Sequence, residues 1–230
     1  MPDNQRCVIL VPVARHIEPE CEKALQYLER EGYVVRRVWG FSDISRGRSQ
    51  IITDALAGDF DEFMWIDSDI AFDPRDIEKL RSHQLPVVGA IYPAKGQRRL
   101  TCVNLKSSEV IQFGEKGGLI EVAALAGGFI LVRRQVYELV KAACKLPECR
   151  SSSPNGIVPY YLPLVVPLPG DDRPSLLGED ISFCERVRQS EVKIHADTTM
   201  RLFHIGRYFY GWEDAGHDVK RSPNYTFRIE

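Results

Sequence analysis

The sequence predicts an α/β protein with a mostly parallel central sheet flanked by helices, and a smaller antiparallel sheet after it. Two observations carry this prediction. Over roughly the first hundred residues, apolar runs of strand length alternate with helical patterns, which is typical of β-α-β units and a parallel sheet. After that point, short apolar runs are separated by Gly, Ser and Lys, as in antiparallel hairpins.

The parallel part is expected to alternate regularly between strands and helices. Its first strand, 6–13, is mostly apolar, and the helix at 18–32 ends with a Gly at a C-cap position. The other elements expected here are strands at 33–39, 63–66 and 85–91 and helices at 50–56 and 73–83. Ligands of such sheets bind beyond the carboxyl ends of the strands, so residues 13–16 and 40–43 are expected near a ligand.

The antiparallel part is less regular. The elements expected in it are strands at 100–105, 110–113, 119–122, 124–132, 193–197 and 200–206 and helices at 133–143 and from 179 onward. Residues 145–177 are rich in Pro, Ser and Gly, which indicates either a mobile loop or a second-substrate surface.

The composition is that of an ordinary globular protein. The 230 residues are 44% hydrophobic and 27% charged, which is enough for a sizeable core. The formal net charge is −2 and no basic stripe dominates, so nucleic-acid binding is not indicated. We find no apolar run as long as a membrane span and no signal peptide at the start, so we expect a cytoplasmic protein with reduced cysteines.

Two carboxylates one residue apart, Asp67 and Asp69, follow the buried strand at 63–66. Carboxylates are hard oxygen ligands that suit Mn2+ or Mg2+. A cation held in this way usually serves a phosphate or diphosphate. The two acids can share one cation only if the chain bends between them or if one of them binds through water. The alternative is that Asp67 caps a turn and Asp69 is solvated.

Two arginines, Arg46 and Arg48, stand at a predicted helix start. The helix dipole at this end favours anions, so two cations are unusual there. A phosphate bound between the arginines would explain them. Solvated surface arginines would explain them equally well.

Paired small residues and paired acids follow later in the chain. Gly127 and Gly128 interrupt an apolar run, which indicates either a close approach to the backbone or a bulge. Glu179 and Asp180 open an amphipathic helix. They either cap the helix and interact favourably with its dipole, or one of them points into a site as a general base or contacts the acceptor.

The last part of the chain offers a histidine and an aromatic tail. A lone histidine such as His204 is more often structural, but it precedes a Gly at the end of an apolar segment, where a metal ligand can be presented. Residues 207–212 are aromatic and include Trp212. They either close over a ligand as a lid or pack on the core.

Taken in order, these motifs resemble the GT-A fold of nucleotide-sugar-dependent glycosyltransferases, and family 2 in particular. The resemblance covers most of the chain. The features that carry it are the opening β-α-β with Val11-Pro12-Val13, the helix start Ser45-Arg46-Gly47-Arg48, Trp65-Ile66-Asp67-Ser68-Asp69, Gly127-Gly128-Phe129-Ile130-Leu131-Val132, and Gly178-Glu179-Asp180 with His204 behind.

The resemblance implies a metal-dependent enzyme that moves a sugar from a UDP- or GDP-linked donor to a hydroxyl of a glycan, lipid, protein or other acceptor. It implies Mn2+ or Mg2+ bound by Asp69 and His204, with Asp67 on the metal or the donor ribose. The donor-binding residues that it implies are Pro12, Val13, Ala14 and Arg15 around the nucleobase, Arg46 or Arg48 at the diphosphate, and Asp67 with Ser68.

The resemblance also implies an acceptor side built from Gly127, Gly128, the acids at 179–180 and Trp212 in the tail. In an inverting enzyme Asp180, with Glu179 as its neighbour, would deprotonate the acceptor hydroxyl. In a retaining enzyme no such base is needed, and the pair would orient a sugar. The sequence leaves this choice open, together with the base, the sugar and the acceptor.

On this basis we expect one GT-A domain over residues 1–230. Its nucleotide-binding half would be 1–100, its acceptor-side half 101–206 with the mobile loop 145–177, and its tail 207–230 a candidate lid. Two other functions stay open. One is a metal-dependent phosphatase of the haloacid-dehalogenase type, whose Asp-x-Asp normally follows the first strand of the chain. The other is a catalytically silent nucleotide-sugar-binding protein.

Overall fold

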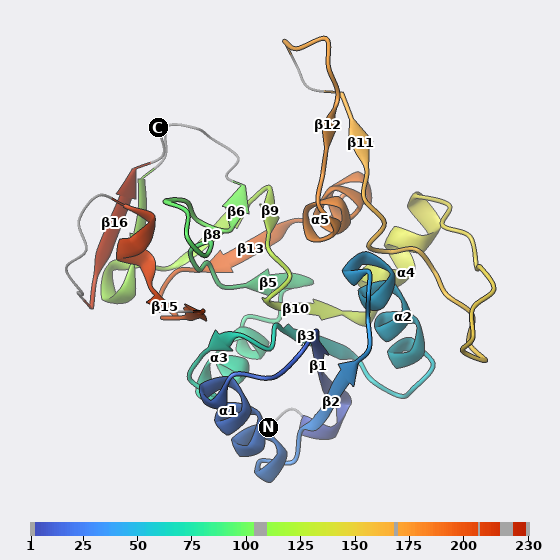
Figure 1. Ribbon diagram of the computed structural model, residues 1–230, viewed down its shortest axis with the longest axis horizontal. Helices are drawn as coiled ribbons and strands as arrows, with labels where there is room; N and C mark the ends of the chain where they lie inside the picture. Colours follow the sequence, from blue (N-terminus) through green and yellow to red (C-terminus); the bar gives the residue numbers. More distant parts are fainter. Residues whose placement is uncertain (1–2, 104–109, 168–169, 207, 217–222, 229–230) are drawn as a thin grey trace.

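A computed structural model describes residues 3–103, 110–167, 170–206, 208–216 and 223–228. Its centre is a seven-stranded sheet in the order β2-β1-β3-β10-β5-β13-β8 (Figure 1). In that order the strands are Val34–Trp39, Cys7–Val13, Glu62–Ile66, Phe129–Arg133, Val87–Gly89, Ile194–Asp197 and Leu119–Val122.

Most strands of this sheet run in one direction. β2, β1 and β3 are parallel neighbours, and so are β5 and β13. β10 runs antiparallel between β3 and β5, and β8 runs antiparallel to β13 at the edge. The predicted α/β class with a mostly parallel central sheet is therefore confirmed.

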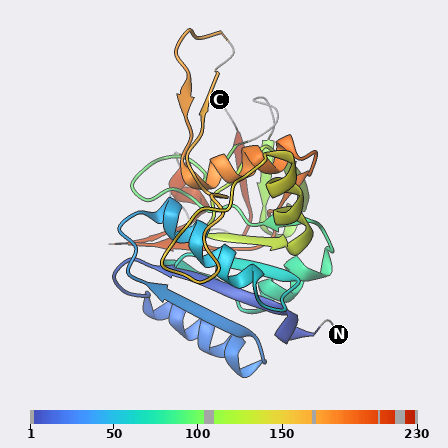
Figure 2. The same cartoon turned by 90° about the vertical axis from the view of Figure 1, so that its right-hand side faces the viewer.

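Helices cover both faces of the sheet (Figure 2). α1 (Pro19–Arg30) and α3 (Arg75–Ser82) pack on one face. α2 (Ile44–Leu56), α4 (Arg134–Ala143) and α5 (Glu179–Gln189) pack on the other. Because both faces are covered, β1 and β3 are buried along their whole length, which explains their nearly continuous apolar sequences.

Small antiparallel sheets accompany the central one in the described residues, where the sequence predicts a single smaller sheet. They pair β11 (Val165–Val166) with β12 (Ser175–Leu176), β16 (Tyr225–Arg228) with β7 (Val110–Phe113), β6 (Cys102–Val103) with β9 (Ala124–Leu125), and β14 (Phe203–Ile205) with both β15 (Phe209–Tyr210) and β4 (Ile70–Ala71). Short 3-10 helices lie at Asn4–Arg6, Gly114–Lys116 and Trp212–Ala215. The pairing of β4 with β14 puts His204 opposite Ile70, next to Asp69.

Helix α2 begins earlier than the predicted residue 50. It starts at Ile44, and the Asp43 carboxylate caps it by accepting hydrogen bonds from the backbone N–H groups of Ser45 (2.9 Å) and Arg46 (3.4 Å). The prediction is wrong because this first part of the helix is polar and shows no apolar period. Arg46 and Arg48 therefore lie within the helix.

Two segments that the sequence analysis treats as single units are each divided between different parts of the structure. The predicted strand at 124–132 is interrupted at residues 126–128, so that β9 pairs with β6 while β10 enters the central sheet. In the segment 145–177, Tyr160 and Tyr161 join the core, and the β11–β12 hairpin projects from the body (Figures 1 and 2). Residues 104–109, within or beside the predicted strand at 100–105, lie outside the described residues. In the described part of the chain, no helix is both long and apolar enough to cross a membrane.

Candidate functional site

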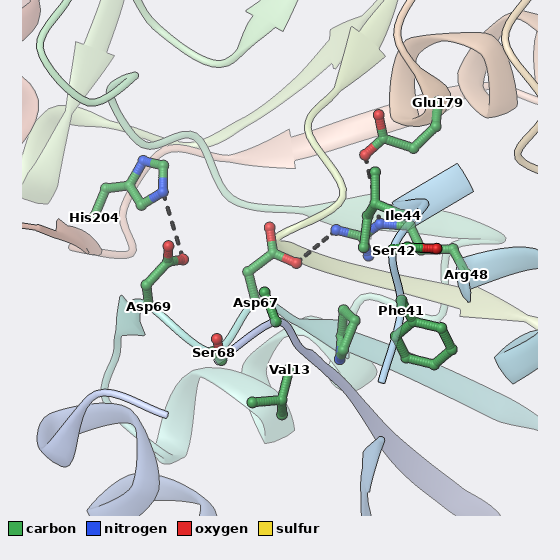
Figure 3. A pocket seen from close by; sticks show the side chains of 12 residues that line it. Val13, Phe41, Ser42, Ile44, Arg48, Asp67, Ser68, Asp69, Glu179 and His204 are labelled. Carbon is green, nitrogen blue, oxygen red and sulfur yellow. Dashed lines mark hydrogen bonds and ion pairs between the residues drawn. The ribbon is translucent and has the colours of Figure 1, made fainter. Parts of the chain in front are cut away.

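A cavity of about 400 Å³ opens at the carboxyl ends of β1 and β3 (Figure 3). β1 and the loop after it contribute Pro12, Val13 and Ala14 to its lining, and the segment after β3 contributes Asp67, Ser68 and Asp69. The predicted residues Arg48, Glu179 and His204 reach it from other elements. Phe41 and Ser42, from the segment 40–43 that is expected near a ligand, complete the wall together with Ile44, which the sequence does not single out. Arg15 and Arg46 are exposed and do not line it.

The two acids of the Asp-x-Asp motif point to different partners (Figure 3). A turn in which the Ile70 N–H donates to the Asp67 carbonyl (3.1 Å) bends the chain between them. The Asp67 carboxylate lies 2.5 Å from the Arg48 guanidinium, whereas the Asp69 carboxylate faces Lys95 and His204. The two carboxylates therefore interact with different side chains.

Arg48 is a buried cation, because only 3% of it is exposed. Its guanidinium donates to Asp67 and to the Gly127 carbonyl (3.3 Å), lies 3.7 Å from the Glu179 carboxylate, and packs over the Trp65 ring. A solvated surface arginine, one of the two sequence-based alternatives, is therefore excluded for Arg48. The residue instead joins Asp67, from the end of β3, to Glu179, from the start of α5.

Removing this cation is expected to destabilise the fold. Arg48→Met leaves Asp67 and Glu179 without their shared counter-ion, so we expect the free energy of unfolding to fall by about 3 kcal/mol. Chemical denaturation measures this change. The control is Arg46→Met, an exposed arginine of the same helix, which should change stability by less than about 0.5 kcal/mol. If the free energy of unfolding falls by less than about 1 kcal/mol in Arg48→Met, the ion pairs of Arg48 with Asp67 and Glu179 do not have the expected structural role.

The paired glycines are explained by side chains of the chain itself. A Cβ atom on Gly128 would lie 2.2 Å from the Tyr92 hydroxyl oxygen and 2.7 Å from an Asp67 carboxylate oxygen. A Cβ on Gly127 would lie 3.1 Å from the Arg48 guanidinium carbon. The Gly128 N–H also donates to the Tyr92 hydroxyl (3.0 Å). Of the two sequence-based alternatives, the structure therefore shows the close approach.

Asp69 and His204 face each other across one side of the cavity. The His204 Nε2 atom lies 3.5 Å from an Asp69 carboxylate oxygen, and Lys95 contacts the other oxygen. Burial acts to raise the pKa of Asp69, but the contacts with His204 and Lys95 outweigh it and lower this pKa. Asp69 is therefore a carboxylate at neutral pH.

The tautomer of His204 follows from its other nitrogen. Nδ1 lies 3.1 Å from the Pro93 carbonyl oxygen, which can only accept, so Nδ1 carries the proton. Nε2 is then the ring nitrogen that faces Asp69. A ring N–H that donates to a backbone carbonyl is the usual support of a metal-binding histidine. The pair fits a divalent cation with two protein ligands, although no group of three or more His, Cys, Asp or Glu side chains within the described ranges forms a metal site.

The first turn of α5 separates two cavities. Glu179 lines the first, and its pKa is raised by burial and by the charge of Asp180, against the lowering effect of Arg48. Asp180 lines a second cavity of about 530 Å³, together with Ala126 and Leu177. The Asp180 carboxylate is fixed there, because it accepts from the backbone N–H groups of Ile181 (2.7 Å) and Gly127 (3.3 Å).

Trp212 lies elsewhere. It is 1% exposed, its ring stacks on Phe113 with centroids 5.0 Å apart, and the Arg201 guanidinium lies 4.7 Å from its ring. It lines neither of the two cavities. Of the two alternatives for the aromatic tail, Trp212 therefore follows the second, because it packs in the core.

Comparisons with known proteins show the fold. No protein-family model matches the chain, and no curated protein matches it in sequence. The crystal structure of A197 from STIV matches with a TM-score of 0.57 and 14% identity, over 94% of this chain and 98% of that one. This similarity shows a shared fold.

Weaker structural matches include glycosyltransferases. A Drosophila beta-1,4-galactosyltransferase 7 mutant, solved with manganese, UDP-Gal and xylobiose, matches with a TM-score of 0.41 and 15% identity over 94% of this chain and 76% of that one. TarS residues 1–349 from S. aureus, solved with UDP-GlcNAc, match with a TM-score of 0.38 and 12% identity over 84% of this chain and 55% of that one.

Proposed function

We propose that this chain is a metal-dependent GT-A glycosyltransferase that moves a sugar from a nucleoside-diphosphate-sugar to an acceptor hydroxyl. The observation that carries the proposal is the meeting of Asp69 and His204 beside a cavity at the carboxyl ends of β1 and β3. In α/β sheets this edge is where ligands bind. A carboxylate and an imidazole held there suit Mn2+, with the remaining ligands supplied by a diphosphate.

The residues of the first cavity divide into two groups under this proposal. Pro12, Val13 and Phe41 offer apolar surface to a nucleobase, while Asp67 and Ser68 offer hydrogen-bonding groups to the ribose. The cation, held by Asp69 and His204, would stabilise the charge that develops on the leaving nucleoside diphosphate. Arg48 is proposed to orient Asp67 through their 2.5 Å ion pair, in place of the diphosphate contact that the resemblance implies.

The second cavity is proposed to receive the acceptor. The start of α5 lies between the two cavities, because Glu179 lines the first and its neighbour Asp180 lines the second. A group bound in the second cavity would therefore lie beside these two acids and could approach the donor sugar there. Asp180 is the proposed general base, because its carboxylate lines this cavity in a fixed orientation. A phosphatase of the haloacid-dehalogenase type needs the first acid of the motif as a nucleophile, and Asp67 is instead bound to Arg48.

Nucleotide binding tests the proposal. We expect one of UDP and GDP to raise the melting temperature only when Mn2+ is present, because binding to the folded state stabilises it by about 2.7 kcal/mol at a ligand concentration of 100 Kd. UMP and GMP are the matched controls, and they should give no Mn2+-dependent shift because they lack the second phosphate. No shift with either diphosphate would contradict the proposal. Release of nucleoside diphosphate from the donor then separates an enzyme from a silent binding protein.

A further inference from the structure

We infer that Lys95 is a built-in competitor for the proposed cation, so that the cation site fills readily only when an anionic ligand draws the Lys95 ammonium away. The inference rests on the proposed function for the identity of the cation. It concerns how that same site is regulated, and the contacts of Lys95 carry it.

The Lys95 ammonium contacts one oxygen of the Asp69 carboxylate, while the His204 Nε2 atom faces the other oxygen. Both Asp69 oxygens thus already have a partner. A divalent cation that binds Asp69 beside His204 must compete with the ammonium for the carboxylate charge. Lysine suits this role because its ammonium is a compact charge on a flexible stem, which can leave without disturbing the backbone.

The chain holds Lys95 in place for this contact. Lys95 lies in a tight loop that is closed by a hydrogen bond from the Ala94 N–H to the Arg99 carbonyl (3.0 Å). Gly206 leaves room for the lysine stem, because a Cβ there would lie 3.3 Å from the Lys95 Cδ atom. The same segment supplies the Pro93 carbonyl that orients His204. Residues 93–95 therefore act on both proposed cation ligands.

An anionic ligand changes the balance. A nucleoside diphosphate bound beside Asp69 would offer the displaced ammonium a new partner, so the loss of the Lys95–Asp69 ion pair would be offset. Cation and nucleotide would then strengthen each other's binding, and by linkage the effect is reciprocal. Without Lys95, the cation should bind tightly on its own, and the mutual strengthening should shrink.

Titration of Mn2+ without nucleotide, followed by electron paramagnetic resonance, tests the inference. Lys95→Met should bind Mn2+ more tightly than wild type, on the order of tenfold, as removal of one charged competitor at a partly exposed site suggests. Lys95→Arg keeps the charge and should not gain affinity. The matched control is Lys141→Met, which removes another lysine from an ion pair, with Glu148, at a similar side-chain exposure (38% against 35% for Lys95).

Each outcome decides the matter. Unchanged or weaker Mn2+ binding by Lys95→Met would overturn the inference, and so would an equal gain in Lys141→Met. If none of the proteins binds Mn2+, the inference falls together with the cation assignment. If Lys95→Met binds Mn2+ more tightly but neither UDP nor GDP binds to wild type, the competition stands while the proposed glycosyltransferase function fails.

Discussion

Asp69→Asn is expected to abolish Mn2+-dependent nucleotide binding, with a loss of affinity of about 100-fold or more. Asn keeps the size of the side chain but removes the negative charge that attracts the cation and the anionic oxygen that would bind it. It also leaves the Lys95 ammonium without its carboxylate partner, so the positive charge of Lys95 is no longer balanced beside His204. Calorimetric titration with the nucleotide that stabilises the wild type, with and without Mn2+, measures the loss.

Asp73→Asn is the control for this experiment. Asp73 lies four positions further along the chain, is exposed to a similar extent, and is paired with Arg75, and neither of these two residues lines the first cavity. It should bind nucleotide within about twofold of wild type, as expected for a surface substitution away from the site. Normal Mn2+-dependent affinity in Asp69→Asn would show that the cation is held elsewhere, and the metal assignment would then be wrong.

The fold was predictable because its signals are local. Alternating apolar runs and helical patterns over the first hundred residues follow from how each segment buries one face or both faces. The parallel order of β1, β2 and β3 then follows from short β-α-β connections. The same reasoning places the Asp-x-Asp motif at the carboxyl edge of the sheet, and the structure has it there.

The environment of Arg48 was not predictable, because it depends on contacts between distant segments. The polar face of α2 is buried against residues 156–161, more than a hundred positions away. There the Ser49 hydroxyl accepts from the Tyr161 N–H (3.1 Å) and the Thr53 hydroxyl accepts from the Val158 N–H (3.0 Å). Because the polar groups of this buried face are hydrogen-bonded, the face does not need apolar residues, and the sequence shows no apolar repeat there. The early helix start and the burial of Arg48 could therefore not be predicted from the sequence.

Lys95 was missed for a related reason. A single lysine in a loop has no sequence pattern, and its contact with Asp69 depends on tertiary features such as the closed loop between Ala94 and Arg99 and the close approach of the lysine stem to Gly206. His204 could be proposed from its place at the end of an apolar segment. Its orientation, however, depends on the Pro93 carbonyl, which belongs to a different part of the chain. Site residues held by tertiary contacts are thus less visible in the sequence than the strands that carry them.

Asp180→Asn is expected to separate binding from catalysis. If the enzyme inverts, the variant should bind the nucleotide and Mn2+ normally but transfer the sugar about 100- to 10,000-fold more slowly, because the general base is lost. The single amide oxygen of Asn can still accept from the Ile181 N–H (2.7 Å), but its NH2 group cannot accept from the Gly127 N–H, so the variant keeps the shorter hydrogen bond at the start of α5 and loses the longer one (3.3 Å). Single-turnover transfer, measured beside nucleotide affinity, gives the two values that are needed.

Glu179→Gln completes the comparison, because Glu179 lines the first cavity and Asp180 the second. Burial and the charge of Asp180 raise the pKa of Glu179, so its carboxyl group holds a proton more readily than an exposed glutamate does. We expect Glu179→Gln to weaken donor binding and to lower transfer less than Asp180→Asn does. Full transfer in Asp180→Asn with loss of transfer in Glu179→Gln would move the base to Glu179. Full transfer in both would leave no base in this pair, which agrees with a retaining enzyme, because a retaining enzyme needs no such base.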